Sequence, residues 1–261
     1  MQTYILQSNT FLGLFVGQNV ITLQSINSTN NYLKEILTKS KPIPEGTVIM
    51  AVEQLAGRGQ VGNTWHSEPG KNLTFSVLLH PTFLPVEQQF QLNKTICLAL
   101  NDVLSAYFGS SAQIKWPNDS YVDKQKIGGI LIENNIQGNL IKQSIVGIGL
   151  NVNQYHFPSA LKNVTSFNRI TFREFDLISL LKEICGAIEA RYLQLKARKS
   201  KEMDAEYLNK LYLLDQWGMY LVNGKIQSGK IVGVSASGHL QIEIENQIKE
   251  YGLKEIEFIS N

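Results

Sequence analysis

The chain has 261 residues, of which 43% are hydrophobic and 18% charged, so it can bury a substantial core. Its 24 basic and 22 acidic residues give a net charge of +2, which argues against nucleic acid or an anionic membrane as a partner. No stretch approaches the ~18 consecutive apolar residues of a membrane span. Residues 11–17 are apolar but lack the basic start of a signal peptide. We expect a soluble, cytoplasmic protein.

The predicted strands of the first two thirds are short apolar runs bounded by turn residues: 12–23, 47–52, 73–79, 112–116, 126–133 and 141–152. Helices are predicted after the cap residues 27–29, over 87–108, and within 172–214, where apolar residues form one stripe. From Asp215 onward, Asn223-Gly224, Ser228-Gly229 and Ser237-Gly238 predict tight hairpins. The pattern indicates a sheet-rich α+β domain over 1–214 and a small β-barrel over 215–261.

The two cysteines indicate neither a zinc site nor a disulfide. Cys97 and Cys185 lie far apart in apolar stretches, without CxxC spacing or a nearby set of histidines. We expect both to be buried free thiols in a reducing compartment.

Residues 53–71 form a long glycine-rich loop between two predicted strands, and loops of this length are often functional. Gly57–Gly62 (GRGQVG) satisfies the G-x-G-x-x-G fingerprint, so a dinucleotide-binding oxidoreductase is one alternative. That fingerprint needs a helix directly after the turn, and Asn63-Thr64-Trp65 does not start like one. Residues 224–231 (GKIQSGKI) have P-loop spacing, but they lie among hairpins and lack the hydroxyl residue.

A glycine-rich loop that carries an arginine suits an enzyme that brings two anions together. Backbone amides and the Arg58 guanidinium neutralise a carboxylate and a phosphate, and closure of the loop excludes water. Lys115, in KWPND, and Lys126, in KIGG, follow near strand ends. Each lysine alone has a plain structural explanation, but together with the loop they indicate an acyl-adenylate site.

Five motifs follow one another along the chain: Ser28-Thr29-Asn30, EQLAGRGQVGNTW, KWPND, KIGGILIE and GIGLNVN. In this order they resemble the catalytic domain of biotin protein ligases. Residues 215–261 resemble the small SH3-like C-terminal domain of that family. Lipoate ligases share the fold, but their arginine-glycine-glycine signature has no counterpart here. The resemblance implies a mixed-sheet catalytic domain followed by an SH3-like β-barrel.

The resemblance also implies an activity. Such an enzyme activates biotin with ATP and Mg²⁺ to biotinyl-5′-AMP, and then transfers biotin to a lysine of a biotin carboxyl carrier protein. Family members are monomers or homodimers, and the sequence leaves this choice open. A ligase for another acyl group such as lipoate, and a catalytically silent binding protein, stay open as alternatives.

The resemblance implies roles for individual residues. Those implied to contact biotin are Ser28, Thr29, Asn30, Gln54, Gly57, Arg58, Gly59, Gln60, Trp65, Lys126, Gly128 and Gly129. The implied nucleotide contacts are Arg58, Trp65, Lys115, Asn118 and Asn151, and Asp119 is the implied metal contact. Arg58, Lys115 and Lys126 are the implied catalytic residues. Helix capping is the other role open to Ser28 and Thr29, and core packing is the other role open to Trp65.

The loop departs from the GRGRxGR pattern common in bacterial members, because Gln60 and Asn63 replace arginines. Arg58 is therefore the main cation of the loop. Some members begin with a winged-helix DNA-binding domain, for which we expect no room before Ser28. The small net charge agrees with the absence of operator binding.

Overall fold

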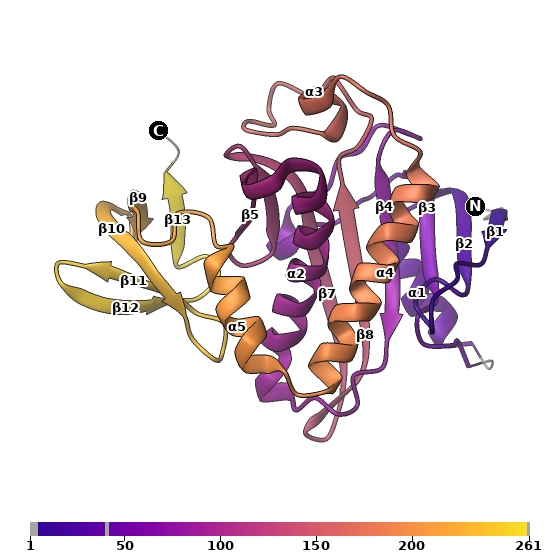
Figure 1. Ribbon diagram of the computed structural model, residues 1–261, viewed down its shortest axis with the longest axis horizontal. Coiled ribbons are helices and arrows are strands. Elements are labelled where there is room, and N and C mark those ends of the chain that lie inside the picture. Colours follow the sequence, from indigo (N-terminus) through magenta and orange to yellow (C-terminus); the bar gives the residue numbers. More distant parts are fainter. Residues whose placement is uncertain (1–4, 40–41, 260–261) are drawn as a thin grey trace.

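The computed structural model describes residues 5–39 and 42–259, which form two β-sheets and the helices packed on them (Figure 1). The larger sheet has eight strands in the order β1-β2-β3-β4-β8-β7-β6-β5. These strands are β1 (Ile5–Asn9), β2 (Val20–Ile26), β3 (Val48–Gln54), β4 (Leu73–Leu79), β5 (Ala112–Lys115), β6 (Asp119–Val122), β7 (Gln125–Gln137) and β8 (Leu140–Leu150). Only the β2–β3 pair is parallel, because α1 crosses between those two strands.

The helices are α1 (Thr29–Leu37), α2 (Gln89–Phe108), α3 (Phe167–Thr171), α4 (Leu177–Lys196) and α5 (Ser200–Asn209). Single 3-10 turns occur at Gln60–Gly62, Val86–Gln88 and Gly109–Ser111. Helices α2 and α4 lie across one face of the large sheet, and α1 lies on the opposite face (Figure 1). No helix that the structure describes is long and apolar enough to cross a membrane.

Side-chain alternation along β4 separates the two faces of the sheet. Leu73, Phe75, Val77 and Leu79 belong to the main core, together with the apolar stripes of α2 and α4. Leu78 instead packs with Leu33 of α1 and Ile145 of β8 in a second, smaller cluster. This smaller cluster occupies only part of its face, so the rest of the α1 face is left to polar and small residues.

Most predicted elements of this region are confirmed. The strands over 47–52, 73–79, 112–116, 126–133 and 141–152 occur with small shifts of their ends, and so does the helix over 87–108. The helical region 172–214 contains two helices, α4 and α5, which are separated near Arg198, a residue with a φ of 59°. Strand β6 was not predicted, because the chain turns back after only four residues of β5.

The strand expected to start at Leu12 begins only at Val20. The preceding loop satisfies its backbone differently: Leu14, Phe15 and Val16 donate their N–H groups to the carboxylate of Glu189 on α4, at 2.9, 2.7 and 2.9 Å. A side chain therefore replaces the neighbouring strand as the acceptor for these amides.

The smaller sheet has the order β12-β11-β10-β9-β13 and is antiparallel throughout. Its strands are β9 (Trp217–Val222), β10 (Lys225–Val234), β11 (Leu240–Ile244), β12 (Gln247–Tyr251) and β13 (Ile256–Ile259). The expected C-terminal β-structure is thus present as a separate antiparallel sheet, and among the described residues no pairing joins β12 to β13 to close it. The domain boundary at residue 215 stays a prediction.

Two of the three expected hairpin turns are confirmed. Asn223-Gly224 joins β9 to β10, and Ser237-Gly238 lies between β10 and β11. The turn at Ser228-Gly229 is wrong, because both residues pair with β9 inside β10. An added Cβ at Gly229 would lie 2.7 Å from Ile242, so this glycine permits close packing within the sheet.

Replacing Glu189 with Gln should destabilise the protein at neutral pH by about 1–2 kcal/mol, because a charged acceptor of three amides is lost. Burial opposes ionisation, but the backbone N–H groups lower the pKa of Glu189 below its ordinary value. A lowered carboxyl pKa stabilises the fold above the pKa of unfolded glutamate, and this contribution disappears as the pH falls through the folded pKa. Denaturant unfolding at neutral and acidic pH measures the effect.

The matched control is Glu183→Gln on the same helix, where the carboxylate accepts only from the Tyr107 hydroxyl. An amide oxygen can take over that hydrogen bond. A pH-independent loss in Glu189→Gln would contradict the assignment.

Candidate active site

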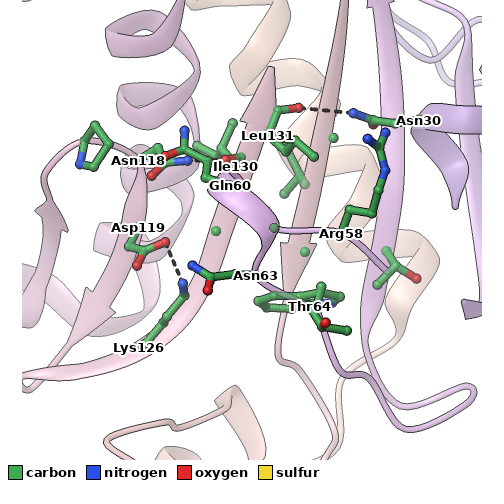
Figure 2. Close-up of a pocket in the computed structure, with 18 of the residues that line it drawn as sticks. Asn30, Arg58, Gln60, Asn63, Thr64, Asn118, Asp119, Lys126, Ile130 and Leu131 are labelled. Carbon is green, nitrogen blue, oxygen red and sulfur yellow. Dashed lines mark hydrogen bonds and ion pairs between the residues drawn. The ribbon is translucent and has the colours of Figure 1, made fainter. Parts of the chain in front are cut away.

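A cavity of about 620 Å³ opens on the α1 face of the large sheet, a size typical of small-molecule sites (Figure 2). Its walls come from the start of α1, the loop after β3, strands β4 and β8, the start of β6 and β7, and the turn before β13. Twelve residues implied by the sequence line it: Ser28, Thr29, Asn30, Gln54, Arg58, Gly59, Gln60, Trp65, Asn118, Asp119, Lys126 and Gly129.

One end of the cavity is built from uncharged hydrogen-bonding groups. Thr29 donates its backbone N–H to Gln54 Oε1 at 2.8 Å, so Gln54 satisfies the first amide of α1. Ser28 occupies the predicted N-cap position, but its side chain makes no cap hydrogen bond. Ser28, Thr29 and Asn30 are all buried, and they face the cavity together with Gln54.

Ser76 of β4 was not predicted from the sequence. It contacts the side chains of Thr29 and Asn30 at this end of the cavity. Its hydroxyl oxygen lies 2.7 Å from Thr29 Oγ1 and 2.6 Å from Asn30 Oδ1, and the residue is fully buried. The available signal was a serine two residues after Thr74 in an otherwise apolar strand. Since side chains alternate, Thr74 and Ser76 share the face that α1 covers.

Glycines of β8 let the surrounding elements approach the sheet. A Cβ added at Gly147 would overlap the Asn30 amide, and one at Gly149 would overlap the indole ring of Trp65. Gly57 is needed for a similar reason, because its Cβ would meet the Trp65 carbonyl oxygen. Trp65 thus lies directly on β8, and its Nε1 is buried without a hydrogen-bond partner in the described part of the chain.

The other end of the cavity carries charge. Lys126 Nζ of β7 lies 2.6 Å from Asp119 Oδ1 at the start of β6. Asn118 is buried beside them and donates its amide to the Ile130 carbonyl oxygen. Figure 2 shows Lys126 pointing toward Asp119, whereas Arg58 points toward Asn30.

Arg58 reaches Glu133 of β7, with 2.8 Å between Arg58 Nη2 and Glu133 Oε2. Glu133 is the last residue of the KIGGILIE motif, and no role was predicted for it from the sequence. Its contact with the loop could not be seen from the sequence, because 75 positions separate the two residues.

Four implied residues lie behind the cavity wall rather than on it. Gly57 supports Trp65, and Gly128 packs against the Gly149 carbonyl. Asn151 is buried and donates to the Thr165 carbonyl at 3.0 Å. Lys115 donates to the Tyr121 hydroxyl at 3.2 Å and lies over the Phe258 ring, 4.7 Å from its centroid. Burial lowers the pKa of Lys115, while the charge of Asp119 acts in the opposite direction.

The loop is a small hairpin rather than a dinucleotide turn. Gly59 N–H donates to the Asn63 carbonyl at 2.7 Å, and Trp65 N–H donates to the Gly57 carbonyl at 3.0 Å. Only one 3-10 turn, Gln60–Gly62, lies within it, and extended chain follows. In the described part of the chain no helix begins directly after the turn, as the fingerprint requires, so the dinucleotide alternative is wrong. The P-loop-like spacing at 224–231 lies in the β9–β10 hairpin, as expected.

Comparison with known proteins places this chain in a family. The chain is 30% identical over 248 residues to the bifunctional ligase/repressor BirA of Bacillus spizizenii, covering 93% of this chain and 74% of that protein. The model of the biotin/lipoate A/B protein ligase family matches residues 22–151. The chain belongs to this ligase family. The resemblance to biotin protein ligases that the motifs indicated is therefore confirmed.

Solved structures of ligases agree with the fold. The biotin protein ligase of Aquifex aeolicus in complex with biotin and ATP superposes with a TM-score of 0.77 at 30% identity, covering 93% of this chain and 99% of that one. A biotin–[acetyl-CoA-carboxylase] ligase of Paracoccus denitrificans is 34% identical over 132 residues, which are 50% of this chain and 53% of that protein. The mixed α+β architecture is thus the one found in biotin ligases.

The Gly149–Trp65 contact of this ligase gives a test of the site geometry. Gly149→Ala should push the indole off β8 and cost about 1–3 kcal/mol of stability, as overpacking does. Fluorine NMR of protein labelled with 5-fluorotryptophan follows the ring directly, and Trp65→Phe assigns its signal. The control is Gly186→Ala on α4, where nothing lies within 4 Å of an added Cβ. An unmoved Trp65 signal in Gly149→Ala would contradict this packing.

Proposed function

We propose that the chain is a biotin protein ligase, which activates biotin with ATP to biotinyl-5′-AMP and transfers biotin to a lysine of a biotin carboxyl carrier protein. The observation that carries the proposal is the division of one cavity into two ends. Hydroxyl and amide groups of Ser28, Thr29, Asn30 and Gln54 form one end, Lys126 lies beside Asp119 at the other, and Arg58 points toward Asn30. Biotin has the matching shape, with an uncharged ureido head and a carboxylate tail.

In this assignment the ureido head binds among the groups at the start of α1, whose orientation is fixed by Gln54 and Ser76. Trp65 covers the bound molecule. Gly59 and Gly129 allow the chain to approach the ligand closely, and Gln60 lines the same cavity. The head is thus recognised by preorganised neutral hydrogen bonds, which cost little to desolvate compared with charges.

The chemical step joins two anions, the biotin carboxylate and the α-phosphate of ATP. Lys126 and Arg58 neutralise both groups and hold them in contact, so positioning and electrostatic stabilisation provide most of the rate enhancement. Lys115 acts from behind the wall, where Tyr121 and Phe258 fix its ammonium group. Asn118 lines the cavity and precedes Asp119 in the chain, and we assign it to the nucleotide. We assign Asn151 to the nucleotide as well, although it lies behind the wall.

Asp119 is the carboxylate that would hold Mg²⁺. The described residues contain no cluster of three or more His, Cys, Asp and Glu side chains, so the other ligands would be phosphate oxygens and water. One carboxylate with substrate phosphates is a usual set for this ion, and Asp119 fits it. When bound, Mg²⁺ would offset phosphate charge.

The acceptor is a protein lysine, and a carrier domain is the partner that the proposed activity requires. A homodimer stays a proposal; the exposed strand β1 at one edge of the large sheet is a surface that could support it. A cytoplasmic location is also a proposal. It is supported by Cys97 and Cys185, which are buried and unpaired as in proteins of reducing compartments.

Exchange of labelled pyrophosphate into ATP tests the proposed function. With biotin as the acid we expect exchange, because adenylation is reversible and releases pyrophosphate. Without an acid, or with lipoate, no exchange is expected. Exchange with lipoate would favour a lipoate ligase, and no exchange with either acid would favour a binding protein without this chemistry.

Lys126→Ala should lower biotin-dependent exchange by at least ~100-fold, the effect of removing one preorganised charge contact. The control is Lys124→Asn. Lys124 is an exposed lysine on the neighbouring turn with a φ of 66°, a backbone region that asparagine tolerates. Unchanged exchange in Lys126→Ala would mean that this lysine is structural. Equal losses in both variants would mean that the effect is not specific to the site.

A further inference from the structure

Glu133 of β7 joins two cavity residues through one carboxylate. Its Oε2 lies 2.8 Å from Arg58 Nη2 of the loop and accepts a hydrogen bond from Asn30 Nδ2, also at 2.8 Å. The other oxygen, Oε1, lies 2.6 Å from Lys34 Nζ on α1. The carboxylate is largely buried and does not itself line the cavity. It therefore stands behind a side chain assigned to the biotin head and a side chain assigned to the anion.

The charges of this cluster do not cancel, so Arg58 can still attract an anion. Glu133 carries one negative charge and contacts two cations, Arg58 and Lys34, so the cluster keeps a net positive charge. Burial alone would raise the pKa of Glu133, but hydrogen bonds from Lys34, Asn30 and Arg58 lower it, so the group stays ionised at neutral pH. Lys34 is about half exposed and lies outside the cavity, so it acts as the counter-charge.

The geometry also leaves donors on Arg58 available. The guanidinium has N–H groups on three nitrogens, and the contact with Glu133 uses Nη2. An arginine on a glycine-rich loop is otherwise free to sample many rotamers, and ordering it on binding weakens affinity. The Glu133 contact fixes the side chain before the ligand arrives.

We propose that Glu133 is a positioning residue, which orders Arg58 in the ligand-free enzyme and links it to Asn30 at the biotin end of the cavity. This inference rests on the proposed function, because it assigns Arg58 to the anion and Asn30 to the biotin head. Because Gln60 and Asn63 are uncharged, Arg58 is the main cation of the loop. Glu133 holds this arginine in place.

Glu133→Gln is the informative variant, because the amide keeps the shape and can still accept from Asn30, while the ion pair with Arg58 is lost. In pyrophosphate exchange, KM for biotin should rise by about tenfold, the effect of roughly 1.4 kcal/mol of lost preorganisation. The value of kcat should change less than KM. Lys34→Gln, which removes the exposed partner of the same carboxylate, is the matched control and should leave KM within about twofold, as for a solvated pair.

A double-mutant cycle identifies the route by which Glu133 acts. In an Arg58→Ala background, Glu133→Gln should add no further increase in KM, since contacting residues are non-additive. Full additivity of the two changes would overturn the proposal, and so would equal effects of Glu133→Gln and Lys34→Gln. Glu133→Asp keeps the charge but withdraws the carboxylate, so it replaces Glu133→Gln if that variant does not fold, with a smaller increase in KM expected.

A second measurement does not depend on activity. Trypsin must bind the Arg58 side chain in an opened loop, so release of that side chain from Glu133 in Glu133→Gln should speed cleavage at Arg58-Gly59 by roughly threefold to tenfold in the absence of ligand. Lys34→Gln should not. If the wild-type enzyme lacks biotin-dependent exchange but this difference is seen, the proposed function fails while the Glu133–Arg58 link holds. Normal wild-type exchange with no effect of Glu133→Gln in either measurement would refute only the positioning role.

Discussion

The alternation of side chains along β4 and β8 is the constraint on which the structure depends. These two strands are paired at the centre of the large sheet. Leu73, Phe75 and Val77 anchor the helices on one face, so the same strand must present Thr74 and Ser76 on the other. The seven residues of β4 therefore contribute both to the main core and to the floor of the cavity. A register shift by one residue would lose both.

Small residues on β8 extend this arrangement to the loop. Gly147 and Gly149 alternate with Val146 and Ile148, which point into the main core. Because these two positions carry no side chain, Asn30 and Trp65 come into direct contact with the strand. The cavity is therefore bounded by a rigid sheet below and by the loop and the start of α1 above. Rigid elements hold hydrogen-bonding groups more precisely than loops alone can.

The sequence predicts features that depend on neighbouring residues or on repeated patterns. Apolar runs located the central strands, the glycine-rich segment located the loop, and five ordered motifs indicated the family. What could not be predicted depends on contacts between distant residues. Ser76 has no motif and acquires its place only because α1 crosses over β4. Ser228-Gly229 looks like a turn, yet it lies within β10 because Ile242 of the next strand needs the space of a missing Cβ. The sequence likewise predicted the strands of the C-terminal sheet but not which edge strands pair.

The placement of Lys115 shows a further limit of reading motifs. The motifs suggest equal roles for Lys115 and Lys126, but Lys126 lines the cavity while Lys115 lies over the Tyr121 and Phe258 rings. One of these rings belongs to Phe258 on β13, in the C-terminal sheet. The C-terminal part thus fixes a lysine of the catalytic part, which no pattern within either segment reveals. We therefore assign Lys115 the role of a positive charge that is held in a fixed position behind the cavity wall.

The charge of the cavity explains how a loop with one arginine can serve an anionic reaction. The charged residues that line it are Arg58, Lys126, Lys254, Asp119 and Glu257, a net charge of +1. Lys254 comes from the turn before β13 and has a φ of 72°, a backbone region that costs a non-glycine residue about 1 kcal/mol. Lys254 brings a cation to the cavity from an element other than the loop. Under the proposed function ATP adds several negative charges, which a net +1 cannot balance, so a divalent ion, which Asp119 would hold, would offset part of that charge. With Gln60 and Asn63 uncharged, Lys254 of the C-terminal turn supplies a cation that the loop does not.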